Sequence, residues 1–456
     1  MDVGSRHEAF IPYPRKDIIK LCLADKKLEG ESVAAFQSFC NLLTAFYHFQ
    51  FHTTLEDIKE NYRVFNPNSD VQPLYTPTLQ EYEQMGEKVV QAFKQTLEQA
   101  NYYPMPPETI RQALDSRSLI NLRTDVDFDD FEQCLCYYRG DVYQTIPQKR
   151  FFFWKAERRI DILERLVLLV KFKGEGYFRT KEKKRRQRSQ AERKFIPGKM
   201  YVYFYKNIPK LDLDLLFPNV QTSMTLRDRL MLAIPAIGAA ASVALKAIPN
   251  ILLLAAAILL ALNADSALQT IGVQAEQARN IMPVLIATLT LAIALGGFAA
   301  KQYSQYKNKK IKFQKDVTDT LFFKNLANNA SVFQMLVDIA EEEECKEIIL
   351  VYYHLLTSPA PLSPEALDAQ IETWLIEKTG AAINFDIHGP LQNLQRIRGR
   401  TPQSDDERPL LEYDAQGRCC VLPLTEAATV LDYVWDNAFR YNTQGQAANP
   451  DAPSGA

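Results

Sequence analysis

Two histidines and a run of glutamates are the residues whose types and spacing come nearest to catalytic or metal chemistry. His48 and His52 in FYHFQFH lie four residues apart, so a helix places both on one face, as in helical zinc sites. No glutamate follows His48 in an H-E-x-x-H arrangement, and no third ligand is close in the sequence. We therefore predict packed or hydrogen-bonded histidines and no metal site.

Glu341 to Glu344, together with Glu347, form an acidic segment in a helical pattern. Di-iron bundles use Glu-x-x-His pairs that project inward, and this segment has none. We expect these carboxylates on a solvated helix face. The chain also lacks a GxGxxG sequence, a Walker loop, a G-x-S-x-G elbow and a C-x-x-C pair. The sequence therefore predicts no enzyme, no catalytic residue and no cofactor.

The segment 181–194, KEKKRRQRSQAERK, holds eight basic and two acidic residues without apolar periodicity, which indicates a mobile basic loop. It is a solvated connector, or it binds anionic headgroups, to which clustered cations are attracted. Nucleic acid is the least favoured partner, because no aromatic residues are interleaved. The candidate anionic-lipid contacts are Lys183, Lys184, Arg185, Arg186, Arg188, Lys307, Lys309 and Lys310.

The elements that position these residues change in type along the chain. Helical periodicity dominates 1–122, β-rich runs in 123–226 indicate a small α+β region, and helix returns in 301–358. In 359–442 two helices, a hairpin and a final helix follow one another, as in a winged-helix-like domain. The hairpin is predicted around 415–417, and a disordered tail at 443–456.

The most apolar part of the chain is predicted to enter a membrane. Residues 281–300 contain no charge and, as a helix, span roughly 30 Å, the thickness of the hydrocarbon core. We expect a shorter first span at 248–264, preceded by an interfacial or re-entrant helix at 227–247. Lys246 then lies at the headgroups, at an interface or in a pore.

Flanking charge decides how many times the chain crosses. Basic residues lie on both outer flanks of the apolar region, while the loop between the spans contains a single basic residue, Arg279. This distribution obeys the positive-inside rule for two crossings better than for a third span at 230–247. The predicted fold class is a membrane protein, mainly α with a small antiparallel sheet (α+β), with a two-helix transmembrane hairpin and a winged-helix-like C-terminal domain.

The overall composition of the chain does not distinguish a membrane protein from other folded proteins. The chain has 456 residues, 47% of them hydrophobic and 24% charged, and a formal net charge of -2, values typical of folded protein. Seven cysteines without a regular framework indicate a reducing compartment. We predict two or three structural units.

Several phrases resemble the transmembrane-protein-143-like family, whose members carry domain of unknown function 3754. These phrases are RHEAFIP, FYHFQFH, YKNIPKLDLDLLFP, LFFKNLANNASV, EEEECKEIILVYYHLL and LDYVWDNAF. The resemblance implies two membrane helices in the same position and supplies no catalytic residue. It places the protein in a bacterial inner or thylakoid membrane of the cyanobacterial type, or in an organellar membrane.

The functional prediction is a membrane-anchored scaffold or regulatory protein with both soluble parts on the cytoplasmic, stromal or matrix side. The alternative is an oligomeric channel or transporter built from the hairpin. The expected partners are the lipid bilayer, anionic lipids and further copies of the chain.

Overall fold

The computed structural model describes most of the chain outside its apolar segment. The described residues are 8–71, 74–106, 108–110, 123–151, 154–185, 195–223, 321–401 and 404–437, with scattered positions between 286 and 315. They fall into two compact units. The first unit is assembled from 1–110, 127–210 and 325–456, and the second from 111–126 and 211–324.

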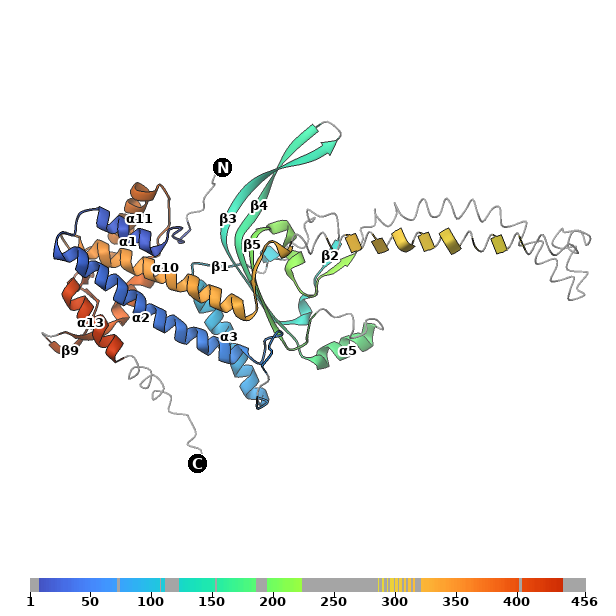
Figure 1. The fold of residues 1–456 in the computed structure, drawn as a ribbon, viewed down its shortest axis with the longest axis horizontal. Coiled ribbons are helices and arrows are strands. Elements are labelled where there is room, and N and C mark those ends of the chain that lie inside the picture. The colour runs from blue at the N-terminus through green and yellow to red at the C-terminus, as the bar shows by residue number, and fades with distance from the viewer. Residues whose placement is uncertain are drawn as a thin grey trace, which may run out of the picture. The chain divides into compact units, whose positions relative to one another are not determined.

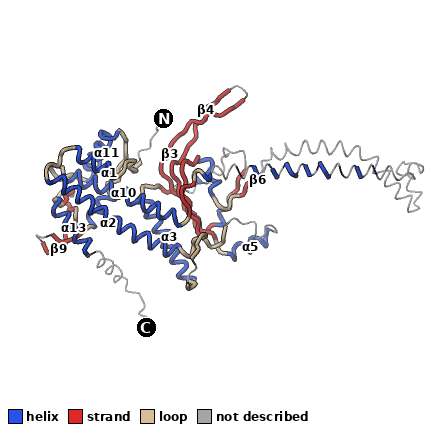
Figure 2. The backbone as a smooth tube through the Cα atoms, viewed as in Figure 1, coloured by secondary structure: helices blue, strands red, loops and turns tan. Residues whose placement is uncertain are grey.

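An antiparallel sheet forms one part of the first unit (Figures 1 and 2). Its strands lie in the order β1 (Tyr103–Pro104), β3 (Phe131–Phe151), β4 (Trp154–Phe172), β5 (Met200–Pro209) and β7 (Asn325–Asn328). β3 and β4 form a long hairpin, and every neighbouring pair is antiparallel. The sequence prediction of a small antiparallel sheet is confirmed.

Helices pack against one another beside this sheet (Figure 1). The N-terminal helices are α1 (Arg15–Ala24), α2 (Glu31–Tyr62) and α3 (Leu79–Gln99). α2 buries aromatic and aliphatic side chains at three- and four-residue spacing from Phe36 to Tyr62, so one face of the helix joins the core. Tyr62 fixes the end of this helix to the sheet, because its hydroxyl donates a hydrogen bond to the Met200 carbonyl at 2.8 Å.

The central helix of this unit is α10 (Ala330–Leu356), which packs on α1, α2, α3, α11 and α12. Every residue from Glu343 to Leu355 is buried. Phe39 of α2 stacks on Tyr352 with ring centroids 4.0 Å apart. A helix that is buried on all sides needs partners for its polar groups as well as its apolar ones, and α10 carries several charged residues into the core.

The C-terminal elements follow in the predicted order. They are α11 (Pro364–Thr379), α12 (His388–Arg396), β8 (Arg398–Thr401), β9 (Ser404–Pro409), β10 (Leu411–Tyr413), β11 (Cys419–Val421) and α13 (Leu424–Asp436). The hairpin predicted around 415–417 is confirmed by the antiparallel pairing of β10 with β11. These elements share one hydrophobic core with the N-terminal helices instead of forming a winged-helix-like core of their own.

The second unit is described over fewer residues. Strands β2 (Arg123–Asp125) and β6 (Gln221–Ser223) pair antiparallel, and the 3-10 helix η3 (Lys210–Leu216) buries most of its side chains. Phe322 and Phe323 are exposed, and the described positions between 286 and 315 are helical.

The predicted membrane fold is corrected. No helix within the described ranges is both long and apolar enough to cross a membrane. The long helices α2 and α10 instead bury their apolar faces in the protein core and carry charged residues. Of the predicted segments, 227–247 and 248–264 lie outside the described residues, and 281–300 is described only at scattered positions. The predicted membrane anchor, multi-pass location and hairpin channel are therefore not supported by the described residues.

Two local predictions also change. Part of the basic segment 181–194 is helical, because α5 (Glu175–Arg185) includes its first residues and Lys181 forms ion pairs with Asp127 and Asp130. The helical region predicted at 301–358 is interrupted by β7, whose backbone pairs with β5. In both places contacts with residues distant in sequence override the local pattern.

Candidate functional site: the groove between α2 and α3

Two pockets follow one another along the line where α2 and α3 pack. The larger has a volume of about 810 Å³, the smaller about 220 Å³, and Gln95 of α3 lines both. We call the two together the α2–α3 groove. It lies entirely within the first compact unit.

One wall of the groove is a line of polar side chains on α3, which we call the α3 stripe. Its members are Gln84, Lys88, Gln91, Gln95 and Gln99, spaced three or four residues apart. This spacing places them on one side of a helix. A capping box fixes the start of α3, because the Thr78 hydroxyl accepts from the Glu81 amide while the Glu81 carboxylate accepts from the Thr78 amide at 2.7 Å.

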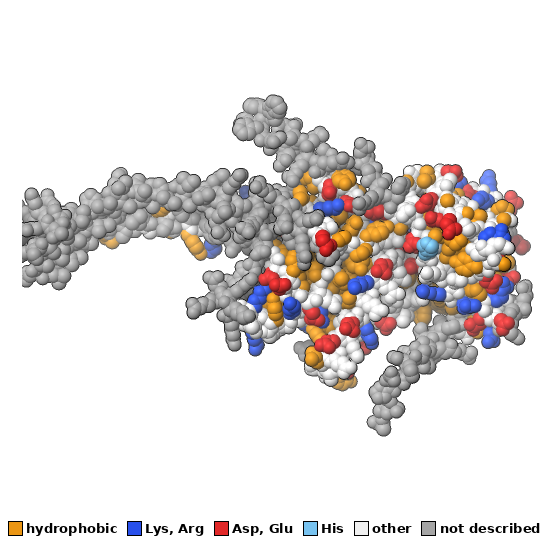
Figure 3. Space-filling view, turned by 180° about the vertical axis from the view of Figure 1, so that it is seen from behind, with side chains coloured by type: hydrophobic (Ala, Val, Ile, Leu, Met, Phe, Trp, Pro, Cys, Tyr) orange, Lys and Arg blue, Asp and Glu red, His pale blue; other side chains and the backbone are white. Residues whose placement is uncertain are grey.

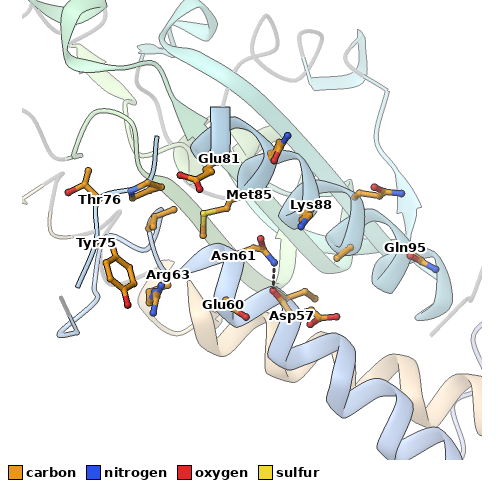
Figure 4. Close-up of a pocket in the computed structure, with 16 residues that line it drawn as sticks. Asp57, Glu60, Asn61, Arg63, Tyr75, Thr76, Glu81, Met85, Lys88 and Gln95 are labelled. Carbon is orange, nitrogen blue, oxygen red and sulfur yellow. Dashed lines mark hydrogen bonds between the residues drawn. The ribbon is translucent and has the colours of Figure 1, made fainter. Parts of the chain in front are cut away.

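The facing wall is a second polar line on α2, the α2 stripe, formed by Gln50, Thr54, Asp57 and Asn61. Figure 4 shows Asp57 and Asn61 across the larger pocket from Lys88 and Gln95. Asn61 is partly engaged, since its side-chain nitrogen donates to the Asp57 carbonyl at 2.7 Å. The side chains of Gln84, Gln91 and Gln95 make no hydrogen bond with another described residue. The groove therefore offers free amide groups.

Between the stripes the floor of the groove is largely apolar. Ile58 and Phe51 of α2 are buried there, and Met85 of α3 points between the two helices in Figure 4. Tyr75, Thr76 and Pro77, from the segment between the helices, line the open end, where Leu74 and Tyr75 are strongly exposed. The lining of the larger pocket is therefore mostly polar, with a smaller number of apolar side chains between the two walls.

The other end of the groove is the smaller pocket, where α12 contributes Asn393 and Arg396. Arg396 is exposed and forms no ion pair with a described residue. Ile397, which is buried, also lines this pocket. The only cationic side chain of this pocket is therefore free to meet an anion.

A buried carboxylate supports this pocket from behind. Glu344 of α10 accepts hydrogen bonds from the side chains of Asn393 and Gln99, both of which line the pocket. Burial raises the pKa of Glu344 to about 7, although these bonds and the charge of Arg396 oppose the shift. The two amides are held in place by a group that titrates near neutral pH.

Glu347 lies one turn further along α10 and is also buried. It accepts a hydrogen bond from the Asn101 side chain at 2.7 Å. Burial raises the pKa of Glu347 well above its ordinary value, and the nearby Glu344 and Glu343 raise it further. Two carboxyls this close in the interior disfavour simultaneous ionisation.

Glu343 faces another direction and binds the N-terminal segment. Lys346 donates to the Glu343 carboxylate at 2.7 Å and to the Ile11 carbonyl at 2.6 Å, and the Ile11 amide donates to Glu343 at 3.3 Å. Burial still raises the pKa of Glu343. The predicted solvated acidic face is therefore wrong, since Glu343, Glu344 and Glu347 are 2%, 7% and 6% exposed.

None of the other residues singled out from the sequence is among the residues that line the groove. His48 is exposed and bonds Glu341 at 3.0 Å, without a metal-ligand partner. Within the described residues no group of three or more His, Cys, Asp or Glu could hold a metal ion. Lys307 is helical and exposed, and Lys183, Lys184 and Arg185 belong to α5 by their backbone. Lys246, Arg186, Arg188, Lys309 and Lys310 lie outside the described residues.

Sequence reasoning did not find the groove. The α3 stripe is visible as glutamines at helical spacing, but amides on a helix usually indicate only a solvated face. The pairing with α2 and the position of Arg396 and Glu344 depend on contacts between segments far apart in sequence.

Comparison with known proteins places part of the chain in context. Residues 163–331 match the family described as "Protein of unknown function (DUF3754)". The matched range covers β5 and β7 of the first unit and η3 and β6 of the second. The α2–α3 groove lies outside it. No solved structure matches the chain.

Proposed function

We propose that this protein is a peptide-binding module that holds an extended segment of a partner protein in the α2–α3 groove. The observation that carries the proposal is the pair of polar stripes that face each other across an apolar floor. We also propose that the chain is related to the transmembrane-protein-143-like proteins. This relationship supplies no site residue.

The chemistry of the stripes favours a polypeptide backbone. An extended peptide presents an N–H and a C=O at each residue, and each needs a partner when it leaves water. A side-chain amide supplies both donors and an acceptor, so a row of amides can pair with such a chain. Phosphate or a metal ion is matched less well, because the α3 stripe has one cation and four neutral amides.

The dimensions agree with a short segment. The α3 stripe runs from Gln84 to Gln99, about 22 Å at the helical rise of roughly 1.5 Å per residue. An extended chain advances roughly 3.3 Å per residue, so about seven residues cover the stripe. Alternate side chains of such a peptide point into the floor, where Ile58 and Met85 would receive apolar groups.

The surface outside the groove supports a local site. On the face in Figure 3, acidic, basic and hydrophobic side chains of the described residues are interspersed. Such a mixed surface gives little long-range steering of a charged partner. Specificity in this proposal comes from the groove.

The test is a positional-scanning library of fluorescent heptapeptides, measured by anisotropy with the full chain. Selected peptides should bind, and each of Gln91→Ala and Gln95→Ala should weaken binding roughly three- to tenfold, the value of one neutral hydrogen bond. Gln80→Ala is the matched control, since Gln80 is an exposed glutamine of α3 that does not line the groove. A library without binders, or binders indifferent to Gln91 and Gln95, would overturn the proposal.

A further inference from the structure

The Arg396 end of the groove differs from the rest in charge and in size. The smaller pocket is about 220 Å³, and its polar lining consists of amides, two threonines, the Tyr47 hydroxyl and one guanidinium. Arg396 has no ionic partner among the described residues. Gln99, the last residue of α3, lines this pocket, so the α3 stripe ends here.

We propose that this pocket binds the free C-terminal carboxylate of the peptide, and that Glu344 takes up one proton from solvent as the carboxylate binds. The inference rests on the proposed peptide-binding function and names the partner class and its regulation. A guanidinium pairs with a carboxylate through two parallel hydrogen bonds. Gln99 and Asn393, already oriented by Glu344, line the same pocket.

The proton uptake follows from the effect of the Arg396 charge on Glu344. In the free protein its positive charge favours the ionised form of Glu344. A peptide carboxylate on Arg396 compensates that charge and adds a second negative charge nearby. Both changes favour the protonated form of Glu344. Because binding raises the affinity of Glu344 for a proton, protonation strengthens binding by the same factor.

The other charged and titratable groups around Glu344 act in the same direction or are already paired. Tyr47 of α2 is kept neutral by burial, which raises its pKa well above the ordinary value. Glu347 and Asp386 disfavour the ionised form of Glu344. Glu343 is paired with Lys346. Besides the hydrogen bonds from Gln99 and Asn393, Arg396 is the cation that favours the ionised form of Glu344, and a bound carboxylate neutralises its charge.

The direction of the pH dependence is fixed by this linkage. The pKa of Glu344 is about 7 in the free protein and higher in the complex. Affinity should therefore be constant below pH 7 and fall as the pH rises through the higher pKa of the complex. Two pKa values about one pH unit apart correspond to a tenfold loss of affinity over the whole pH range, most of it between pH 6.5 and 8.5.

The experiment uses the tightest heptapeptide from the library, synthesised as the free acid and as the C-terminal amide. Calorimetric titration of the full chain in HEPES and in Tris at pH 7.5 gives the number of protons taken up. The free acid should bind at least tenfold more tightly than the amide, with measurable uptake. Arg396→Gln should remove the preference for the acid. Arg398→Gln should retain it, because Arg398 is exposed and does not line the pocket.

The Glu344→Gln variant tests the proton uptake separately from the binding of the peptide carboxylate. This variant should bind the free acid without proton uptake and with the same affinity at pH 6.5 and 8.5. Equal binding of acid and amide, or proton uptake that survives in Glu344→Gln, would overturn the inference while leaving peptide binding intact. Binding of neither peptide form would instead remove the proposed function. The buffer comparison on the unaltered chain decides the question even if a variant fails to fold.

Discussion

Replacing Glu344 by glutamine should make the folded chain less sensitive to alkaline pH. Glu344 is buried, and its pKa is about 7 against an ordinary value of 4.5. A carboxyl whose pKa is raised by folding binds its proton more tightly in the folded state. Its contribution to stability is therefore greatest below pH 4.5 and is lost as the pH rises to 7. Glutamine has the same shape and cannot ionise.

The size of the effect follows from the two pKa values. One pH unit of difference corresponds to 1.36 kcal/mol, so ionised Glu344 lowers the free energy of unfolding by about 3 kcal/mol above pH 7. Urea denaturation at pH 5, 6.5 and 8 measures the quantity. The gap between Glu344→Gln and the unaltered chain should be small at pH 5 and approach about 3 kcal/mol in favour of the variant at pH 8.

A matched control and a clear contrary result complete this test. Glu377 is an exposed glutamate of α11 without an ion pair to a described residue, and Glu377→Gln should leave the pH profile unchanged. If Glu344→Gln follows the unaltered chain at every pH, Glu344 does not carry a raised pKa. The proposed uptake of a proton by Glu344 would then be wrong.

Two further predictions concern the Lys346–Glu343 ion pair of α10 and the capping box of α3. Lys346→Met should lower the free energy of unfolding by roughly 3 to 5 kcal/mol in urea denaturation, because buried Glu343 loses its counter-ion. The control is Lys20→Met, which breaks an exposed pair with Asp17 and should lower this free energy by less than about 1 kcal/mol. Similar losses in both variants would contradict the prediction. Thr78→Ala should lower the free energy of unfolding by about 1 kcal/mol and speed amide hydrogen exchange in the first turn of α3, since it removes the capping box. Unchanged exchange in this turn would show that the capping box does not stabilise the start of the helix.

Local patterns in the sequence predicted much of the secondary structure. α2 and α3 lie in the region 1–122 where helical periodicity was predicted, and α11, α12 and α13 are the two helices and the final helix predicted in 359–442. Ser363 caps α11 by accepting from the Ala366 amide. The antiparallel pairing of β10 with β11 was also predictable. These features depend on residues a few positions apart.

Predictions failed where the deciding contact is distant. The glutamates of α10 look solvated in sequence, but their partners include Ile11, Asn101 and Asn393. β7 pairs with a strand more than a hundred residues earlier. The candidate groove was missed for the same reason, because its walls and its arginine come from three separate helices.

The assembly of the first unit from three separated segments has a consequence for how the chain folds. The Ile11 amide meets Glu343 only after more than three hundred further residues have been synthesised. Until α10 leaves the ribosome, the apolar faces of α1 and α2 lack the helix that covers them. Contacts of such long range slow folding and leave exposed surface open to aggregation. The nascent chain thus has a long interval in which chaperones would have to protect its first helices, and a chain that stops before residue 330 should be a substrate for proteolysis.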